Sequence, residues 1–278
     1  MDPFSVNPSV PELIDTWQAA MEDIDTLCTP LTDEQWLAQT PCPGWTVADI
    51  VAHAISIESF IGGDPAPDHL PDWDTLPHVV GPLSQFIETG IDYRRGQSKD
   101  ELLHELRSRT AIRRAQLDAL PVDAEVMGLS GSLTPLSRVV RTRTFDLWAH
   151  EQDIRAAIGD DGHWGSPPAV IAFQQMASAL PFVWGKGVGA PVGASVQLTV
   201  RGPELEGDVF ALVGEDGKAS ASGTVDEPTV HLGLDWPDYM RVSCGRVDVT
   251  DPAFLARVSI EGDAALASTL LEELTITP

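Results

Sequence analysis

The chain has 278 residues and a formal net charge of −25, from 17 basic and 42 acidic side chains. So large a negative charge repels phosphate backbones and cannot gain the counterion release that drives nucleic-acid binding, which excludes DNA and RNA as partners. The composition, 43% hydrophobic and 21% charged, is that of a globular protein, and no apolar run approaches the roughly 18 to 20 residues that cross a bilayer. We therefore expect neither a membrane protein nor a membrane partner.

The beginning of the chain and its cysteines indicate where the protein works. The opening residues MDPFSVNPSVPEL lack the basic and apolar regions of a secretory signal peptide, so we expect a cytoplasmic protein. Cys28, Cys42 and Cys244 are widely spaced and form no CxxC pair, which predicts buried thiols and argues against a disulfide framework or a zinc knuckle. Nothing beside Cys42 in the sequence would activate it as a nucleophile, so we predict a packing role.

The few basic residues are mostly arginines, and they cluster. The clusters are Arg94-Arg95, 107–114 and 138–143. Local positive patches can survive inside a negative overall field, and such a patch could hold an anionic small molecule.

The first 160 residues read as helices. Apolar residues at steps of three and four predict a helix over 11–28. Thr46 and Ser98 each have a cap signature and predict the starts of two more helices, ended by Gly62-Gly63 and by Pro121. Glycines and prolines in 62–78 predict a surface loop, followed by a weaker helix near 79–93. A last helix is predicted from Thr134-Pro135 to Gly159.

The character of the chain changes after residue 160. One more helix is predicted near 168–183, and the segments ASVQLTVRG, DVFALVG and TVHLGLDW alternate as strands do. A terminal helix is predicted near 263–274. The predicted fold class is therefore an all-α domain, residues 1–160, followed by a small α+β domain, residues 161–278, joined at DGHWGSPP.

Two residues of the last helix of the first domain could bind a metal together. Asp146 and His150 are four apart, so they project from one face of the helix, and His53 faces the core of its own helix by pattern. The spacing alone is weak evidence, because five of the seven histidines in this acidic chain have an acidic residue four positions earlier. A core histidine satisfied by a neighbouring carboxylate is the alternative.

Two segments carry a family resemblance. TPCPGWTVADIVAHAISIE, residues 40–58, and RTRTFDLWAHEQDIRAAIG, residues 141–159, resemble the two signatures of the mycothiol-dependent maleylpyruvate isomerase family. The tail segments YMRVSCGRVDV and VSIEGDAALASTLL are similar to the sterol-carrier-like domain that follows in that family. The resemblance implies a DinB-like four-helix bundle followed by a sterol-carrier-like α+β domain.

The resemblance also implies a metal site and a cofactor. His53, Asp146 and His150 match the family's metal ligands, although the family's acid is usually glutamate, so that Asp146 is a departure. Two imidazoles and one carboxylate with open positions are typical of a catalytic zinc site, and the same set suits iron, nickel or cobalt. The family uses the thiol mycothiol, which implies an isomerase or thiol S-transferase acting on a small acidic or conjugated substrate.

Residues near the candidate ligands have possible roles. Asp153 lies three residues after His150 and could orient its ring as a second-shell partner, or could be a surface carboxylate. Arg241 and Arg246 are candidate catalytic residues, because a guanidinium grips carboxylates, or they form ordinary surface ion pairs. Core packing is predicted for two tryptophans near the ligands, Trp45 and Trp148.

Two further functions stay open at this point. One is a thiol-independent tailoring isomerase or cyclase on the same scaffold, with an altered or empty position at Asp146. The other is a non-enzymatic module that binds a small molecule in the sterol-carrier-like half. The sequence does not indicate the substrate or the oligomeric state.

Overall fold

The computed structural model describes residues 1–128 and 131–277, which fold as two compact units. One unit is Pro8–Gly162, and the other combines Met1–Asn7 with His163–Pro278. The first seven residues group with the C-terminal unit because Gln174 Nε2 donates to the carbonyl oxygens of Pro3 and Val6, at 2.7 and 2.6 Å. The predicted helical domain, residues 1–160, includes these seven residues.

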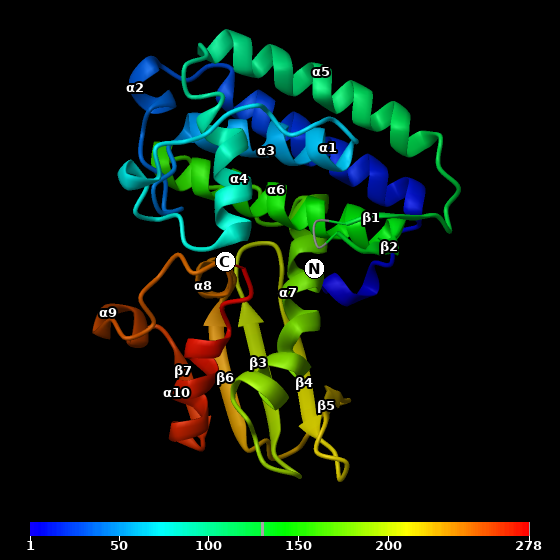
Figure 1. Ribbon diagram of the computed structural model, residues 1–278. Helices are drawn as coiled ribbons and strands as arrows, with labels where there is room; N and C mark the ends of the chain where they lie inside the picture. The colour runs from blue at the N-terminus through cyan, green and yellow to red at the C-terminus, as the bar shows by residue number, and fades with distance from the viewer. Residues whose placement is uncertain (129–130, 278) are drawn as a thin grey trace. The chain divides into compact units, whose positions relative to one another are not determined.

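Four long helices build the N-terminal unit. They are α1 (Val10–Cys28), α3 (Val47–Ile61), α5 (Lys99–Asp118) and α6 (Leu136–Ile158). α1 and α3 each pack against both α5 and α6, and Figure 1 shows the four side by side. Their shared core is apolar and includes the fully buried Trp17, Ile50 and Trp148. The predicted helical bundle is confirmed.

The residues that predict the ends of these helices form the expected capping interactions. Thr46 and Ser98 both form capping boxes, with Asp49 and Glu101 respectively, and so satisfy amide groups in the first turns of α3 and α5. α6 ends at Gly159, whose φ of 70° is a left-handed conformation that glycine adopts without strain.

The start of α6 differs from the prediction. The sequence predicts Thr134 as the cap of this helix, with Pro135 in its first turn. Instead both lie in the short strand β2 (Leu133–Pro135), which pairs with β1 (Glu125–Met127), and Pro135 is the N-cap. Strand pairing therefore uses the extended backbone that precedes the helix.

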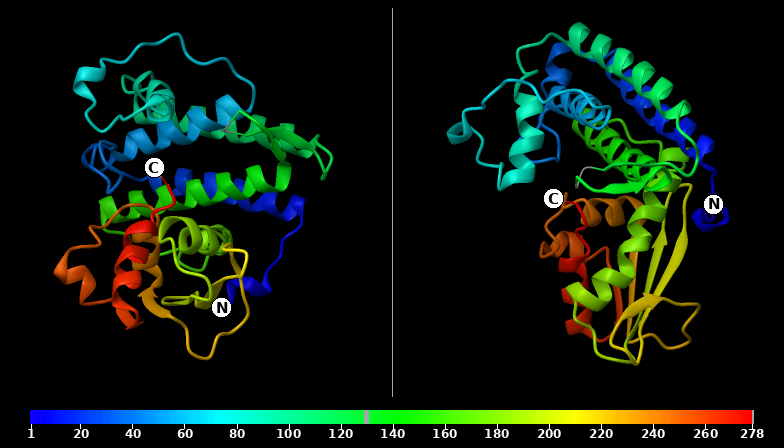
Figure 2. Two further views of the ribbon diagram at one scale, coloured as in Figure 1. Left: turned by 60° about the horizontal axis from the view of Figure 1, so that its bottom comes forward. Right: turned by 45° about the vertical axis from the view of Figure 1, so that its right-hand side comes forward.

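Shorter elements complete the unit. α2 (Asp33–Trp36) follows α1, and the segment between α3 and α5 holds the 3-10 turn η2 (Trp73–Thr75) and α4 (Pro82–Asp92). α4 packs on α3 and runs across the long helices (Figures 1 and 2). It is shorter than the predicted 79–93 because Gly81, at a φ of 87°, precedes a proline that starts the helix.

The C-terminal unit is built on one five-stranded sheet. Its strands are β3 (Ser195–Arg201), β4 (Gly207–Val213), β5 (Ala219–Ala221), β6 (Val230–Asp235) and β7 (Ser259–Gly262), in the order β5-β4-β3-β6-β7. β3 and β6 are parallel and the other neighbouring pairs are antiparallel. The three predicted strands are β3, β4 and β6.

Helices cover this sheet. α7 (Pro167–Phe182) packs against β4 and β5, and α10 (Ala264–Glu273) against β6 and β7. The remaining elements are η1 (Pro3–Ser5), η3 (Val183–Gly187), α8 (Trp236–Ser243) and α9 (Pro252–Leu255). The α+β class is confirmed. Among the described residues, no helix combines the length and hydrophobicity needed to cross a bilayer.

Candidate metal centre

The structure brings the three candidate ligands together from two helices. His53 is on α3, and Asp146 and His150 are one turn apart on α6. His53 Nε2 lies 3.1 Å from Asp146 Oδ2, and His150 Nε2 lies 3.9 Å from Asp146 Oδ1. The two imidazole rings meet edge to face, with their centroids 4.8 Å apart. All three ligand atoms lie within 4.8 Å of one another.

These distances fit a single divalent ion. Nitrogen and carboxylate ligands sit about 2.0 to 2.2 Å from zinc, so neighbouring ligand atoms of a tetrahedral site are about 3.4 Å apart. The side chains of His53 and His150 are 4% and 9% exposed, whereas that of Asp146 is 30% exposed. The group is therefore closed on the histidine side and open on the carboxylate side, as a site that admits a further ligand must be.

The protonation states also suit a cation. Burial lowers the pKa of His53 and outweighs the attraction of Asp146, so the ring is neutral and a nitrogen is free to bind. Burial would raise the pKa of Asp146, but the charge of Arg143 and the contact with His53 hold it well below its usual range. Asp146 is thus an ionised carboxylate at neutral pH.

Asp153 contacts the ring of His150 on the side away from Asp146. Its Oδ2 lies 3.0 Å from His150 Nδ1, and its side chain is 1% exposed. A carboxylate on the second ring nitrogen fixes the tautomer in which Nε2 is bare and can bind a metal. His53 has no such support, because its buried Nδ1 lacks a hydrogen-bond partner among the residues that the structure describes.

A buried ion-pair network, which the sequence does not predict, lies behind the site. Arg143, on α6, donates through Nη1 to Asp146 Oδ2 at 2.6 Å and through Nε to Glu58 Oε1 at 2.8 Å. Glu58 is fully buried and also accepts from Trp17 and Arg113. Arg143 therefore occupies one oxygen of Asp146 and leaves the other, Oδ1, beside His150. The only sequence signal was that Glu58 falls on the buried side of an apolar helix.

Trp45 forms a wall of the site. Its ring centroid lies 4.9 Å from that of His53 and 5.5 Å from that of His150. Trp45 is half-buried, and its Nε1 donates to the buried Glu88 at 3.0 Å. The expectation of a core residue holds for Trp148, which is fully buried, but Trp45 lines the candidate metal centre.

The three cysteines are free and buried, as expected. Cys42 lies close to the site, since its sulfur, a nitrogen of His150 and an oxygen of Asp153 are within 4.8 Å of one another. Its backbone amide donates to Thr40 Oγ1 at 3.2 Å, which holds the turn that carries Trp45. Cys42 thus packs beneath the site at a place that the sequence did not indicate.

The two candidate arginines belong to the other unit. Arg241, on α8, pairs with Asp238 at 3.1 Å and its side chain is 47% exposed. Arg246 follows that helix, and its Nη1 donates to the carbonyl oxygen of Cys244 at 2.7 Å. Neither lies within the bundle that brings the three candidate ligands together.

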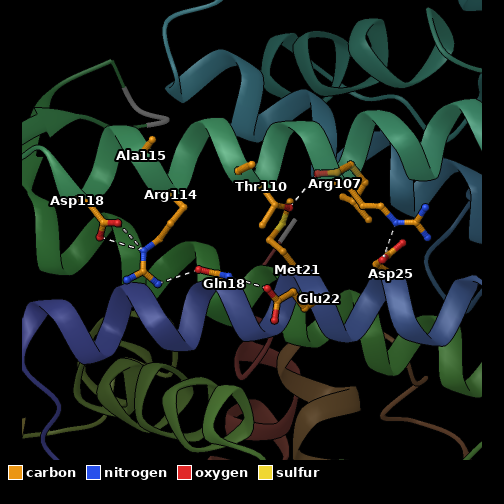
Figure 3. Close-up of a pocket in the computed structure, with 11 residues that line it drawn as sticks. Gln18, Met21, Glu22, Asp25, Arg107, Thr110, Arg114, Ala115 and Asp118 are labelled. Carbon is orange, nitrogen blue, oxygen red and sulfur yellow. Dashed lines mark hydrogen bonds and ion pairs between the residues drawn. The ribbon is translucent and has the colours of Figure 1, made fainter.

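Most arginines of the clusters predicted from the sequence form ion pairs with acidic residues of the bundle. One example is the groove of about 550 Å³ between α1 and α5 (Figure 3), where Arg107 pairs with Asp25 and Arg114 with Asp118, both at 2.9 Å. Carboxylates that line the groove thus neutralise its two arginines. This follows from the composition, in which acidic residues far outnumber basic ones.

The family is decided by a match over the bundle. Residues 17–155, half of the chain, match the sequence model of the mycothiol maleylpyruvate isomerase N-terminal domain. The chain belongs to this family. The match contains all three candidate ligands together with Asp153 and Arg143.

The chain is similar to two curated relatives and to several solved structures, at low sequence identity. A protein of Mycobacterium tuberculosis described as uncharacterized is 23% identical over 142 residues, 51% of this chain and 54% of that protein. The chain thus spans about half the length of the curated relatives it matches. The crystal structure of the mycothiol-dependent maleylpyruvate isomerase superposes with a TM-score of 0.57 at 15% identity, covering 95% of this chain and 97% of that chain. A mutant of that isomerase gives the same TM-score at 13% identity. At such identities the likeness shows a shared fold.

Proposed function

We propose that this protein is a metal-dependent enzyme of the mycothiol-using type, an isomerase or thiol S-transferase that acts on a small acidic or conjugated molecule. The observation that carries the proposal is the convergence of His53, Asp146 and His150, with the ring of His150 oriented by Asp153. Membership in the mycothiol maleylpyruvate isomerase family supports the choice of cofactor.

The three ligands would hold the ion through two neutral imidazoles and one carboxylate, a set that suits zinc first and also iron, nickel or cobalt. A divalent ion held there would supply the positive charge that keeps a nearby thiol deprotonated. The thiol of mycothiol would supply the nucleophilic sulfur. That sulfur would serve either the isomerisation of a conjugated double bond or its own transfer to the product.

The residues of the chain prepare this chemistry in separate ways. Arg143 donates to one oxygen of Asp146 and so favours the position in which the carboxylate faces the two histidines. Trp45 covers both imidazole rings and limits the access of water to them. The partial exposure of Asp146 leaves the open side on which a thiol can approach.

Arg241 and Arg246 remain our proposal for binding the acidic groups of the substrate, because a planar guanidinium matches a carboxylate and stabilises a developing enolate charge. Replacing either by Met should raise KM for an acidic substrate and leave the metal content unchanged. An unchanged KM in both variants would remove this part of the mechanism.

Metal content tests the proposal directly. We expect elemental analysis of the purified protein to find about one equivalent of a divalent metal, and His53→Ala and His150→Ala to lose it. His104→Ala is the matched control, because His104 has the same acidic residue four positions earlier but is exposed on α5. Full metal occupancy in both site variants would refute the metal centre.

Calorimetry then tests the cofactor. We expect mycothiol to bind the metal-loaded protein and to bind far more weakly after the metal is removed by a chelator, because the thiol sulfur would bind the ion. Binding that is unchanged by chelation would show that the thiol, if used, sits elsewhere.

A thiol-independent isomerase or cyclase on the same scaffold is the second candidate. The observation in its favour is the 2.6 Å contact of Arg143 with Asp146, since a carboxylate already engaged by a cation, and shorter than glutamate, is a weaker ligand. Metal-free purified protein, with metal binding gained in Asp146→Glu, would favour this second function over the first.

A further inference from the structure

A second cavity of the bundle has the features of a binding site for a small organic acid. It encloses about 450 Å³ and lies among α3, α4, α5 and the loop that follows α3. Aromatic and apolar side chains form much of its wall, and the rings of Phe60 and Phe86 meet there edge to face with centroids 4.6 Å apart. None of the three candidate metal ligands lines it. A mostly apolar pocket of this size suits a ring-containing molecule.

Arg109, on α5, lines this cavity, and only one of the two nitrogens on the Nε and Nη2 edge of its guanidinium has a partner among the described residues. Its Nη2 pairs with a carboxylate oxygen of Asp64, while its buried Nε has no hydrogen-bond partner among the described residues. The Nε–H and Nη2–H of a guanidinium point the same way and match the two oxygens of one carboxylate. Only half of that edge is engaged here.

A second unpaired donor belongs to a residue that lines the cavity next to the loop of Asp64. The hydroxyl of Ser59, a residue that is 9% exposed, has no hydrogen-bond partner in the part of the chain that the structure describes. Ser59 is held next to Asp64, whose backbone amide donates to the Ser59 carbonyl oxygen at 3.0 Å. A buried donor without an acceptor costs folding free energy. Two such donors in one cavity therefore indicate that a bound molecule supplies the acceptor.

The other arginine of the cavity is already satisfied. Arg94 donates through Nε and Nη2 to Glu105, and through Nη1 to Ser56 and to the carbonyl oxygen of Gly90. An incoming acid would therefore meet Arg109 rather than Arg94.

Asp64 is suited to act as a replaceable partner of Arg109. Its side chain is 42% exposed, and it lies in the loop directly after Gly62-Gly63. A partly exposed ion pair contributes little stability, and glycines give the backbone freedom to move. Release of the Asp64 side chain would free Nη2 of Arg109 for an incoming carboxylate.

We infer that this cavity binds a small aromatic or alicyclic monocarboxylate. The carboxylate takes the place of Asp64 on the Nε and Nη2 edge of Arg109 and accepts a hydrogen bond from the Ser59 hydroxyl, and the ring lies against Phe60 and Phe86. This site needs neither the metal nor the thiol of the proposed function. It gives a use to one arginine of the cluster at 107–114.

The test begins with 2-naphthoate, whose binding to the full-length protein can be followed by its own fluorescence and by calorimetry. In Asp64→Ala the competing carboxylate is gone, and we expect affinity to rise by about two- to fivefold, the strength of a partly exposed ion pair. Asp118→Ala is the matched control, because it removes a carboxylate that is also partly exposed, 52% against 42% for Asp64, and that pairs with an arginine of the same helix. It should leave the affinity unchanged.

Loss of binding is expected from three changes. Ser59→Ala removes one donor, Arg109→Lys removes the two-pronged edge while keeping the charge, and Thr89→Trp places a large ring in the cavity from α4. The neutral amide 2-naphthamide should bind more weakly than the acid. Removal of metal by chelator should change none of these affinities, which separates this inference from the proposed function.

Equal affinity for the acid and the amide, or an affinity that neither Asp64→Ala nor Thr89→Trp alters, would overturn the inference, as would no detectable binding by Asp64→Ala. Because Asp64→Ala is expected to gain affinity, a variant of Arg109 that fails to fold does not leave the question open.

Discussion

Asp146 is held in place by a residue three positions earlier in the chain. The resemblance leads one to expect glutamate at this position, and aspartate is one methylene shorter. Arg143 holds Oδ2 at 2.6 Å, while Oδ1 lies 3.9 Å from His150 Nε2. The position of the shorter side chain of Asp146 therefore depends on the buried ion pair between Arg143 and Glu58.

Asp153 should matter for metal binding although it is not a ligand. Without its carboxylate, His150 loses the partner that selects its tautomer, and we expect Asp153→Ala to weaken metal affinity by about 10- to 100-fold. Competition with a chromogenic chelator measures this change. Asp160→Ala, an exposed carboxylate just beyond the same helix, should retain wild-type affinity. Equal affinities in both variants would argue against a role for Asp153.

At the scale of elements, the ends of helices depend on single backbone conformations. Gly159 ends α6 at a φ of 70°, and nothing lies within 4 Å of the position that a Cβ would take. A substitution there is therefore strained by the backbone alone and not by crowding. α6 carries two of the three candidate ligands, so its correct termination supports the helix on which the site is built.

Gly159→Ala should lower the free energy of unfolding by about 1 kcal/mol, because an alanine pays for the left-handed conformation that glycine adopts freely. Chemical denaturation measures the change. Gly96→Ala is the control, since a Cβ at Gly96 also meets nothing within 4 Å and its φ is not positive. A loss of stability as large in Gly96→Ala would contradict the conformational explanation.

In the C-terminal unit, Asp238 links α8 to the segment that follows α9. It accepts from Arg257 at 2.7 Å and from Arg241 at 3.1 Å, and its side chain is 5% exposed. Burial would raise the pKa of Asp238, but the hydrogen bonds and charge of Arg257, with Arg241, keep it below the ordinary 3.8. The ionised form is therefore the one that the fold stabilises.

Asp238→Asn should cost about 1.5 to 3 kcal/mol of unfolding free energy at pH 7, the range for a hydrogen bond to a charged group. Because the folded pKa is the lower one, this contribution is fully present above the unfolded value near 3.8 and is lost as pH falls through the folded pKa. Denaturation curves of both proteins from pH 7 down to pH 3 test this. A difference that stays constant below pH 3.8 would exclude the ion pair as its cause.

At the scale of the whole molecule, the net charge of −25 opposes the compact state. The bundle places most of its arginines in internal ion pairs, so little positive charge remains to offset the excess of carboxylates at the surface. Self-repulsion between exposed charges is screened by salt, with a Debye length of about 10 Å at 0.1 M.

We therefore expect the Tm of the protein to rise when sodium chloride is increased from low to physiological ionic strength. Scanning calorimetry measures it, and potassium chloride at the same concentrations is the control for a specific effect of sodium. A Tm that falls with salt would mean that the internal ion pairs outweigh the general repulsion.

The sequence by itself determined the long helices, three of the strands and the family. Their signals are local: Thr46 and Ser98 cap helices, Gly159 ends one, and alternating residues mark β3, β4 and β6. The candidate ligands could be predicted because two of them are one turn apart and the family signatures contain all three. These features depend on neighbours along the chain, which the sequence displays directly.

Only the tertiary structure decided which distant groups meet. It showed that Arg143 joins Asp146 to Glu58, that Trp45 covers both histidines, and that strand pairing uses the residues before α6. In a chain with so many carboxylates, the choice of partner for each arginine is set by the packing of helices far apart in sequence. The same packing leaves one edge of Arg109 half engaged beside an apolar cavity.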